Sequence, residues 1–276
     1  MLAAESEFLR SYLKKNSGLA LEVGKEYLLE SRLQDVLKQF SLTHFGQLIN
    51  ELKIGRNYLL RDAVIEAMTT NESYFFRDAI PFQELQSLIL PDLIQQNADS
   101  RQLRIWSAAS STGQEPYSLA IHCDEQMELQ NWDVQITATD IDRTVLKRAE
   151  EGVFTKMEVA RGLTINQIKH YFDSTENGYR VSDKIRSRLS WRPLNLLDYF
   201  PQIGQFDLIF VRNVLIYFDL PTKQDVVARM HKVLKPGGYL FLGAGESLFG
   251  LDKKFTRVTE CKSAVYKSIG SAVGSS

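Results

Sequence analysis

The sequence predicts an α/β domain built on a mostly parallel sheet, with a small all-α domain before it. Two observations support this prediction. The first 70 of the 276 residues carry apolar side chains at helical spacing and show no strand pattern. From about residue 80, short apolar runs typical of strands alternate with helical stretches. Such alternation indicates parallel strands joined by helices that cover both faces of the sheet.

The N-terminal domain is predicted from four amphipathic stretches, in which apolar residues recur every three or four positions. We expect these helices at Phe8–Leu13, Tyr27–Phe40, Phe45–Leu52 and Leu59–Met68. Packed together, they form a small helical bundle, which we place at residues 1–75.

The α/β domain is expected to cover residues 76–267. Its first helix is predicted at Phe82–Ile94 and its last at Pro221–Leu234, just before the sharp turn Lys235-Pro-Gly-Gly-Tyr239. The predicted strands are the apolar runs Leu103–Trp106, Val134–Thr139, Phe206–Val211 and Tyr239–Gly243.

The alternation breaks between about residues 152 and 192, where we expect a small β-rich insertion. Leu163–Phe172 has a helical pattern, and Asn177-Gly178 marks a hairpin turn. Short strand-like pieces at Tyr179–Val181 and Arg188–Trp191 accompany that turn. The last residues, 268–276, are rich in Gly, Ser and Ala, and we expect them to be a disordered tail.

Composition excludes several classes of protein. The formal net charge of −1 gives no sign of a nucleic-acid surface. The two cysteines and four histidines have no metal-ligand spacing, so we expect neither a disulfide framework nor a metal site. Because no apolar run approaches the roughly 20 residues that span a bilayer and the N-terminus is no signal peptide, we expect a cytoplasmic protein without membrane insertion.

The most informative segment is the strand, loop and helix start at residues 103–118. The small residues of 108–113 let the backbone approach a ligand closely, and Pro116 suits the first turn of a helix. Free N–H groups at such a helix start favour a nucleotide-like ligand. The next predicted strand ends at Asp140, where an acid commonly holds ribose hydroxyls.

From the residues alone, this segment leaves alternatives open. Its loop has one glycine, Gly113, and therefore lacks the dinucleotide fingerprint of nicotinamide-dependent oxidoreductases. An ordinary strand-to-helix turn of an α/β protein would fit the same residues.

Four stretches together resemble one family. They are Thr70-Asn-Glu-Ser-Tyr-Phe-Phe-Arg77, Trp106-Ser-Ala-Ala-Ser-Ser-Thr-Gly-Gln-Glu-Pro-Tyr-Ser118, Ala138-Thr-Asp-Ile-Asp142 and Phe206-Asp-Leu-Ile-Phe-Val-Arg-Asn-Val-Leu-Ile-Tyr-Phe218. In order and spacing they resemble the chemotaxis receptor glutamate methyltransferases (CheR). The resemblance covers nearly the whole chain, and it implies a Rossmann-like domain that binds S-adenosylmethionine.

The resemblance implies cofactor contacts in the first three stretches. Asn71, Ser73 and Arg77 match positions that contact the amino-acid part of the cofactor, and a guanidinium suits a carboxylate there. The family often has Thr where Ser73 stands, and the hydroxyl is retained. Glu115 matches an acid that faces the amino group, although a first-turn acid is also favoured by the helix dipole. Asp140 matches the ribose-binding acid.

Further positions follow in the second half of the chain. By the resemblance, Asn195 and Leu196 match a pair near the adenine ring. Arg212, Asn213 and Tyr217 match residues that line the cofactor and the methyl-transfer site.

The implied reaction places a methyl ester on a glutamate side chain. A carboxylate with a pKa of about 4.3 is already ionised at pH 7, so no strong general base is needed. Positioning and removal of water should therefore supply most of the catalysis. We assign Arg77 and Tyr217 as the catalytic candidates, because they could orient the accepting carboxylate or shape the methyl pocket.

The implied partners are the cytoplasmic helices of chemoreceptors, and we expect a monomer. Some family members have a longer hairpin that binds a tethering peptide, whereas Phe172–Val181 is short here, so we expect recognition without a tether. The family docks through a basic face of the helical domain. Here residues 1–70 hold nine basic and nine acidic residues; Lys25 and Arg32, with Lys38 as a third candidate, could share a basic helix face.

Two other functions remain open at this point. One is methyl transfer to a small molecule or to another protein. The other is a signalling module that binds S-adenosylmethionine without catalysis.

Overall fold

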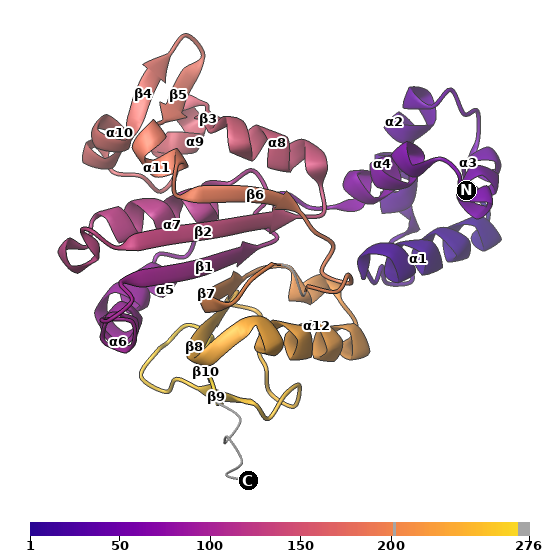
Figure 1. The fold of residues 1–276 in the computed structure, drawn as a ribbon. Helices are drawn as coiled ribbons and strands as arrows, with labels where there is room; N and C mark the ends of the chain where they lie inside the picture. Colours follow the sequence, from indigo (N-terminus) through magenta and orange to yellow (C-terminus); the bar gives the residue numbers. More distant parts are fainter. Residues whose placement is uncertain (201–202, 270–276) are drawn as a thin grey trace.

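The computed structural model describes residues 1–200 and 203–269 and confirms an all-α domain followed by an α/β domain (Figure 1). Four helices form the N-terminal bundle: α1 (Ala3–Ser17), α2 (Glu26–Gln39), α3 (Phe45–Ile54) and α4 (Tyr58–Met68). Their apolar faces meet in a separate core, in which Leu9, Leu13, Leu29 and Leu33 are fully buried.

The α/β domain contains a seven-stranded sheet in the order β6-β2-β1-β7-β8-β10-β9. The strands are β1 (Gln102–Ala108), β2 (Asp133–Asp140), β6 (Leu189–Pro193), β7 (Phe206–Val211), β8 (Leu234–Leu242), β9 (Phe255–Arg257) and β10 (Val265–Ser268). The first five strands of the order are parallel, whereas β10 pairs antiparallel with both β8 and β9. Strand order reverses at β1, which lies between β2 and β7, and such a reversal opens a ligand crevice at the carboxyl ends of the strands.

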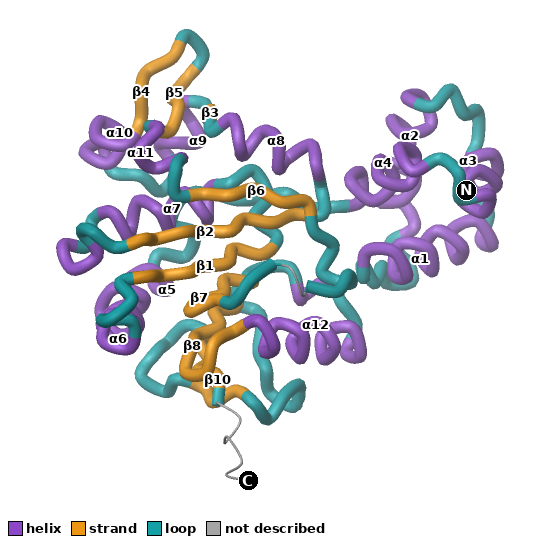
Figure 2. Tube along the Cα trace, viewed as in Figure 1, coloured by secondary structure: helices purple, strands orange, loops and turns teal. Residues whose placement is uncertain are grey.

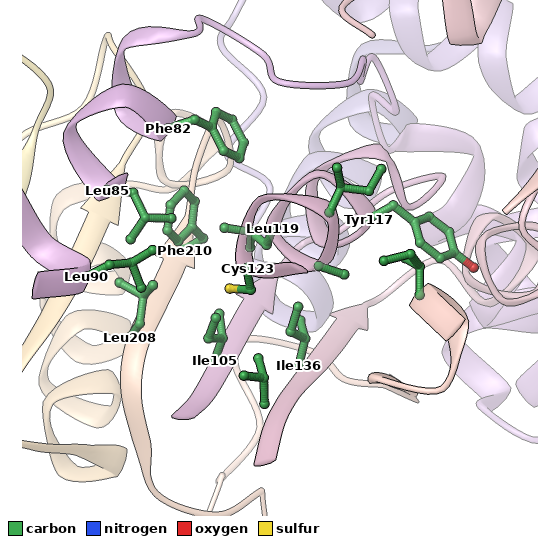
Figure 3. Packing of buried hydrophobic residues seen from close by; sticks show 14 of the residues in the cluster. Phe82, Leu85, Leu90, Ile105, Tyr117, Leu119, Cys123, Ile136, Leu208 and Phe210 are labelled. Carbon is green, nitrogen blue, oxygen red and sulfur yellow. The ribbon is translucent and has the colours of Figure 1, made fainter. Parts of the chain in front are cut away.

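Helices cover both faces of this sheet. They are α5 (Ile80–Glu84), a π-helical turn (Leu85–Ile89), α6 (Leu90–Gln96), α7 (Gln114–Asp124), α8 (Arg143–Glu151) and α12 (Leu220–Val233). Because side chains alternate along a strand, Leu208 and Phe210 of β7 pack with Phe82 and Leu119 on one face (Figure 3). Ile209 and Val211 point to the other face, where they belong to the same apolar cluster as Met230 of α12. The central strand β7 is therefore buried along its whole length, as a parallel strand covered on both faces should be.

The insertion is a three-stranded antiparallel sheet, β3-β5-β4, with short helices around it. Its elements are β3 (Val153–Phe154), α9 (Lys156–Ala160), α10 (Ile165–Tyr171), β4 (Phe172–Thr175), β5 (Gly178–Val181) and α11 (Asp183–Arg186). The prediction that Arg188–Trp191 belongs to this insertion was wrong. That segment lies in β6, which pairs in parallel with β2 at the edge of the main sheet. A short apolar run identifies a strand, but it does not identify the partner of that strand.

The C-terminal part of the sheet also differs from the prediction. The strands β9 and β10 were not expected, and Ser268, which we had placed in the disordered tail, ends β10 and contacts His231. Residues 270–276 of the expected tail lie outside the described residues. Among the described helices, none has the length and apolar character needed to cross a bilayer.

Candidate active site

A cavity lies where β1, β2 and β7 end, at the side of the sheet that faces the helical bundle. Figure 2 shows loops gathered between the strand ends and the bundle. All ten residues predicted for the site line this one cavity: Asn71, Ser73, Arg77, Glu115, Asp140, Asn195, Leu196, Arg212, Asn213 and Tyr217. Segments separated by almost 150 residues in the chain are thus brought together by the fold.

Asp140 ends β2 and is almost fully buried. One carboxylate oxygen accepts the Ser111 N–H at 2.7 Å, and the other accepts the Asp142 N–H at 2.9 Å. Desolvation disfavours the charged form more than these bonds favour it, and the result raises the pKa of Asp140 to about 6. The carboxylate therefore holds the loop after β1 and retains lone pairs for a ligand.

The loop between β1 and α7 has an unusual backbone. Ala109 and Ser111 have φ values of 55° and 51°, in the left-handed region that non-glycine residues rarely adopt. Between them, Ser110 lines the cavity, and its buried hydroxyl has no hydrogen-bond partner in the described structure. Strain and an unpaired donor at one place are typical of a ligand-binding loop.

Glu115 and Arg212 form a buried ion pair beside this loop. The Arg212 Nη1 donates to Glu115 at 3.0 Å, and the other Glu115 oxygen accepts the Ser107 hydroxyl at 2.8 Å. Burial raises the pKa of Glu115, and the charge of Arg212 opposes that rise. Arg212 also donates through Nη2 to the Arg77 carbonyl at 3.0 Å and to Asp78 at 2.6 Å. Its buried Nε has no hydrogen-bond partner in the described structure.

The segment from Asn71 to Arg77 crosses from the bundle to the sheet. The Asn71 side chain donates to Asp142 at 2.8 Å, and its carbonyl accepts the Ser111 hydroxyl at 3.0 Å. Arg77 donates to the Glu72 carbonyl at 2.7 Å, which folds its guanidinium back over the segment. Asp142 also caps α8 by accepting two N–H groups at the start of that helix.

The helical bundle closes one side of the cavity, a feature that local sequence patterns did not reveal. Ser17 and Leu19, at and just beyond the end of α1, line the cavity. Asn195 donates from its side chain to the Asn16 carbonyl at 2.6 Å, and the Ala20 N–H donates to the Tyr217 carbonyl at 2.8 Å. These bonds join the end of α1 and the segment after it to the loops that carry Asn195 and Tyr217.

Glu246 was also not identified from the sequence as a residue that supports the site. Its buried carboxylate accepts N–H groups from Asn213 and its neighbours in the loop after β7. Glu246 lies more than thirty residues away in the sequence, and no local pattern links the two segments.

Two family profiles match the chain. The profile described as "CheR methyltransferase, all-alpha domain" matches residues 4–69, and "CheR methyltransferase, SAM binding domain" matches residues 71–264. The chain belongs to the CheR methyltransferase family. The resemblance stated from the four sequence stretches is thereby confirmed, together with S-adenosylmethionine as the cofactor.

Curated CheR relatives match over almost their whole length. The chain is 42% identical to "Chemotaxis protein methyltransferase 1" of Pseudomonas aeruginosa, over 96% of this chain and 98% of the relative. It is 41% identical to "Chemotaxis protein methyltransferase Cher2" of Pseudomonas putida, over 95% and 97% of the two chains. The chemotaxis protein methyltransferase of Escherichia coli is 35% identical over 88% of this chain and 84% of its own.

The cavity suits the CheR cofactor chemically. Asp140 offers a buried carboxylate to hydroxyl groups, and Glu115 offers one to a positively charged amino group. Ser110 and Arg212 line the same cavity, and the buried Ser110 hydroxyl and Arg212 Nε have no hydrogen-bond partner in the described structure. We found no group of three or more His, Cys, Asp or Glu side chains that could hold a metal among the described residues.

Proposed function

We propose that the protein transfers the methyl group of S-adenosylmethionine to glutamate side chains on the cytoplasmic helices of chemoreceptors, forming methyl esters for sensory adaptation. The observation that carries this proposal is the single cavity in which residues of the CheR helical domain and of its cofactor-binding domain meet. A receptor helix that contacts the bundle would thus lie next to the methyl-transfer site.

Each cofactor residue has a distinct proposed role. Asp140 accepts the ribose hydroxyls, and the donor fork of Arg77 pairs with the carboxylate of the amino-acid part, near Asn71 and Ser73. The remaining lone pairs of Glu115 face the amino group. Four further residues border the adenine and the methyl group: Asn195, Leu196, Arg212 and Asn213.

When bound, S-adenosylmethionine supplies an electrophilic methyl group on a sulfonium. The accepting glutamate is already ionised, so the protein need not remove a proton. The role of Arg77 and Tyr217 is to orient that carboxylate in line with the methyl group and to exclude water from it. Weak rather than strong interactions with the accepting carboxylate suit this role, because the carboxylate loses its charge as the ester forms.

The charges of the bundle bear on how a receptor docks. Five of its nine basic side chains lie within 4 Å of a carboxylate: Arg10, Lys14, Lys25, Lys38 and Arg61. Arg32 is tied to the carbonyls of Met68 and Thr69. The bundle therefore presents a mixed rather than a strongly basic surface, and we propose docking that depends on shape as well as charge.

The insertion gives a second feature of recognition. Its β4–β5 hairpin is closed by the two residues Glu176 and Asn177 and is therefore short. We propose that a monomer in the cytoplasm recognises receptors directly, without a tethering peptide.

The test is transfer of radiolabelled methyl groups from S-adenosylmethionine to purified receptor cytoplasmic fragments, with Asp140→Ala as the control. Alkali-labile label on the receptor, absent with the variant, is the expected result and identifies carboxyl methylation. A lack of label across a panel of receptors, despite tight binding of S-adenosylhomocysteine, would refute the proposal. It would favour a different substrate or a non-catalytic role.

A further inference from the structure

Glu246 lies in the turn after β8 and is only 8% exposed. One oxygen accepts the N–H of Asn213 at 2.9 Å and that of Gly243 at 2.7 Å. The other accepts the N–H of Val214 at 3.0 Å and that of Ile216 at 3.2 Å. No basic side chain among the described residues lies within ion-pair distance of this carboxylate. Its negative charge is therefore stabilised by backbone dipoles.

The loop that Glu246 binds cannot satisfy these N–H groups by itself. Asn213 has a φ of 60°, and the following residues form only a short 3-10 turn, Leu215–Tyr217. A buried N–H without a partner costs about 1–3 kcal/mol, so three unpaired groups in one loop would favour another loop conformation. The carboxylate removes that cost only when the loop has the observed shape.

Gly243 shows how closely the two segments fit. A Cβ atom at this position would lie 2.8 Å from the Asn213 nitrogen and 2.8 Å from Glu246 Oε2. A side chain there would push the carboxylate away from the loop. The contact between the Glu246 carboxylate and the Asn213 N–H therefore needs a glycine at residue 243 as well as the acid at residue 246.

The loop held in this way carries the wall of the cavity on the methyl-transfer side. Asn213, Val214, Ile216 and Tyr217 all line the cavity, whereas Glu246 is not among the lining residues. Its carboxylate acts on the site only through the backbone that it binds.

From this geometry we infer that Glu246 is a positioning residue for methyl transfer, which fixes the loop at residues 213–217 so that Tyr217 meets the accepting carboxylate in line. This inference rests on the proposed function. Misplacement by about 1 Å can lower a rate about 100-fold, so a defect in loop position should affect turnover more than binding.

The test compares Glu246→Gln with wild-type protein in the receptor methylation assay. The amide keeps the size of the side chain, but its NH₂ group must face two backbone N–H donors in either orientation. We expect kcat to fall at least about 10-fold, while the receptor KM and the Kd for S-adenosylhomocysteine change by less than about fivefold. Amide hydrogen exchange at Val214 and Ile216 should become at least about 10-fold faster.

Two further variants complete the design. Glu246→Asp retains the carboxylate and should recover part of the lost kcat. Glu260→Gln removes an exposed acid from the same part of the chain and should behave as wild type. If Glu246→Gln fails to fold, the same comparison is made with Glu246→Asp, which should then show the partial loss of kcat and the faster exchange.

The outcomes separate this inference from the proposed function. Unchanged kcat in Glu246→Gln would overturn the inference, as would equal losses of kcat and cofactor affinity, which would indicate a purely structural role. If wild-type protein labels no receptor, the proposed function fails instead. The loop is then judged by exchange at Val214 and Ile216, and unchanged exchange in the variant overturns its dependence on Glu246.

Discussion

The buried carboxylate of Asp140 predicts a specific pH dependence of cofactor binding. Its pKa is raised to about 6, mainly because burial disfavours the charged form. Ribose hydroxyls that donate to this group favour the charged form, so the bound complex should have a lower pKa than the free protein. Affinity is therefore nearly complete at pH 7 and is lost as the pH falls through about 6.

The size of the effect follows from the ionised fraction. With a pKa of about 6, roughly nine tenths of Asp140 is ionised at pH 7 and about one tenth at pH 5. We therefore expect the Kd for S-adenosylhomocysteine, measured by titration calorimetry, to rise about 10-fold between pH 7 and pH 5. Neither the carboxylate nor the amino group of this ligand titrates in that range.

A substitution separates Asp140 from the other buried acid of the site, Glu115, whose pKa is also raised. Asp140→Asn should weaken binding about 10- to 100-fold at pH 7 and abolish the pH dependence, because it removes one charged acceptor. Asp173→Asn, at an exposed position on β4, should change neither. A wild-type Kd that stays constant from pH 7 to pH 5 would refute the reasoning. An unaltered pH dependence in Asp140→Asn would assign the titration to Glu115.

Three further predictions follow from single residues. Tyr217→Phe should lower kcat about 10-fold and leave the Kd for S-adenosylhomocysteine within about twofold; equal losses in both would exclude its chemical role. Gly162→Ala should destabilise the protein by at least about 2 kcal/mol in urea unfolding, since its Cβ would lie 1.9 Å from the Phe75 carbonyl oxygen. Gly204→Ala, which has a similar φ and an open surrounding, is its control; equal losses in the two variants would contradict the clash. Burial raises the pKa of Cys123 to about 12, so this thiol should resist iodoacetamide at pH 7.5 until urea unfolds the chain, and rapid labelling of folded protein would contradict its burial.

Local sequence patterns were sufficient for the elements that bury an apolar face. The helices of the bundle and the central strands each carry a period that one segment reveals by itself. The position of Asp140 at the end of β2 and of Arg212 after β7 also followed, because parallel strands bring their carboxyl ends to one edge of a sheet. The specific roles of these residues came from the resemblance to the CheR family.

Long-range pairing was not predictable in the same way. The β6 segment was wrongly assigned to the insertion. Its short apolar run predicts a strand, but it does not show that β2 is the partner of that strand. Similarly, the sequence near Asn195 gives no sign that its side chain binds the Asn16 carbonyl, 179 residues away. These contacts depend on the tertiary packing of helices and strands, and the periodicity of a local sequence segment carries little information about that packing.

Three acids near the cavity show that residue type alone does not reveal the role of a side chain, because a buried acid can be an anchor for the backbone as well as a general base. Asp140 and Glu246 use their oxygens for backbone N–H groups of cavity loops, and Asp142 joins the cap of α8 to the side chain of Asn71. In each case the negative charge holds a loop in place before any ligand arrives. The proposed methylation of an ionised carboxylate needs no proton acceptor and would gain mostly from alignment. Buried acids around this site are therefore better explained as anchors of the backbone than as general bases, and their removal should disturb geometry before it disturbs any proton transfer.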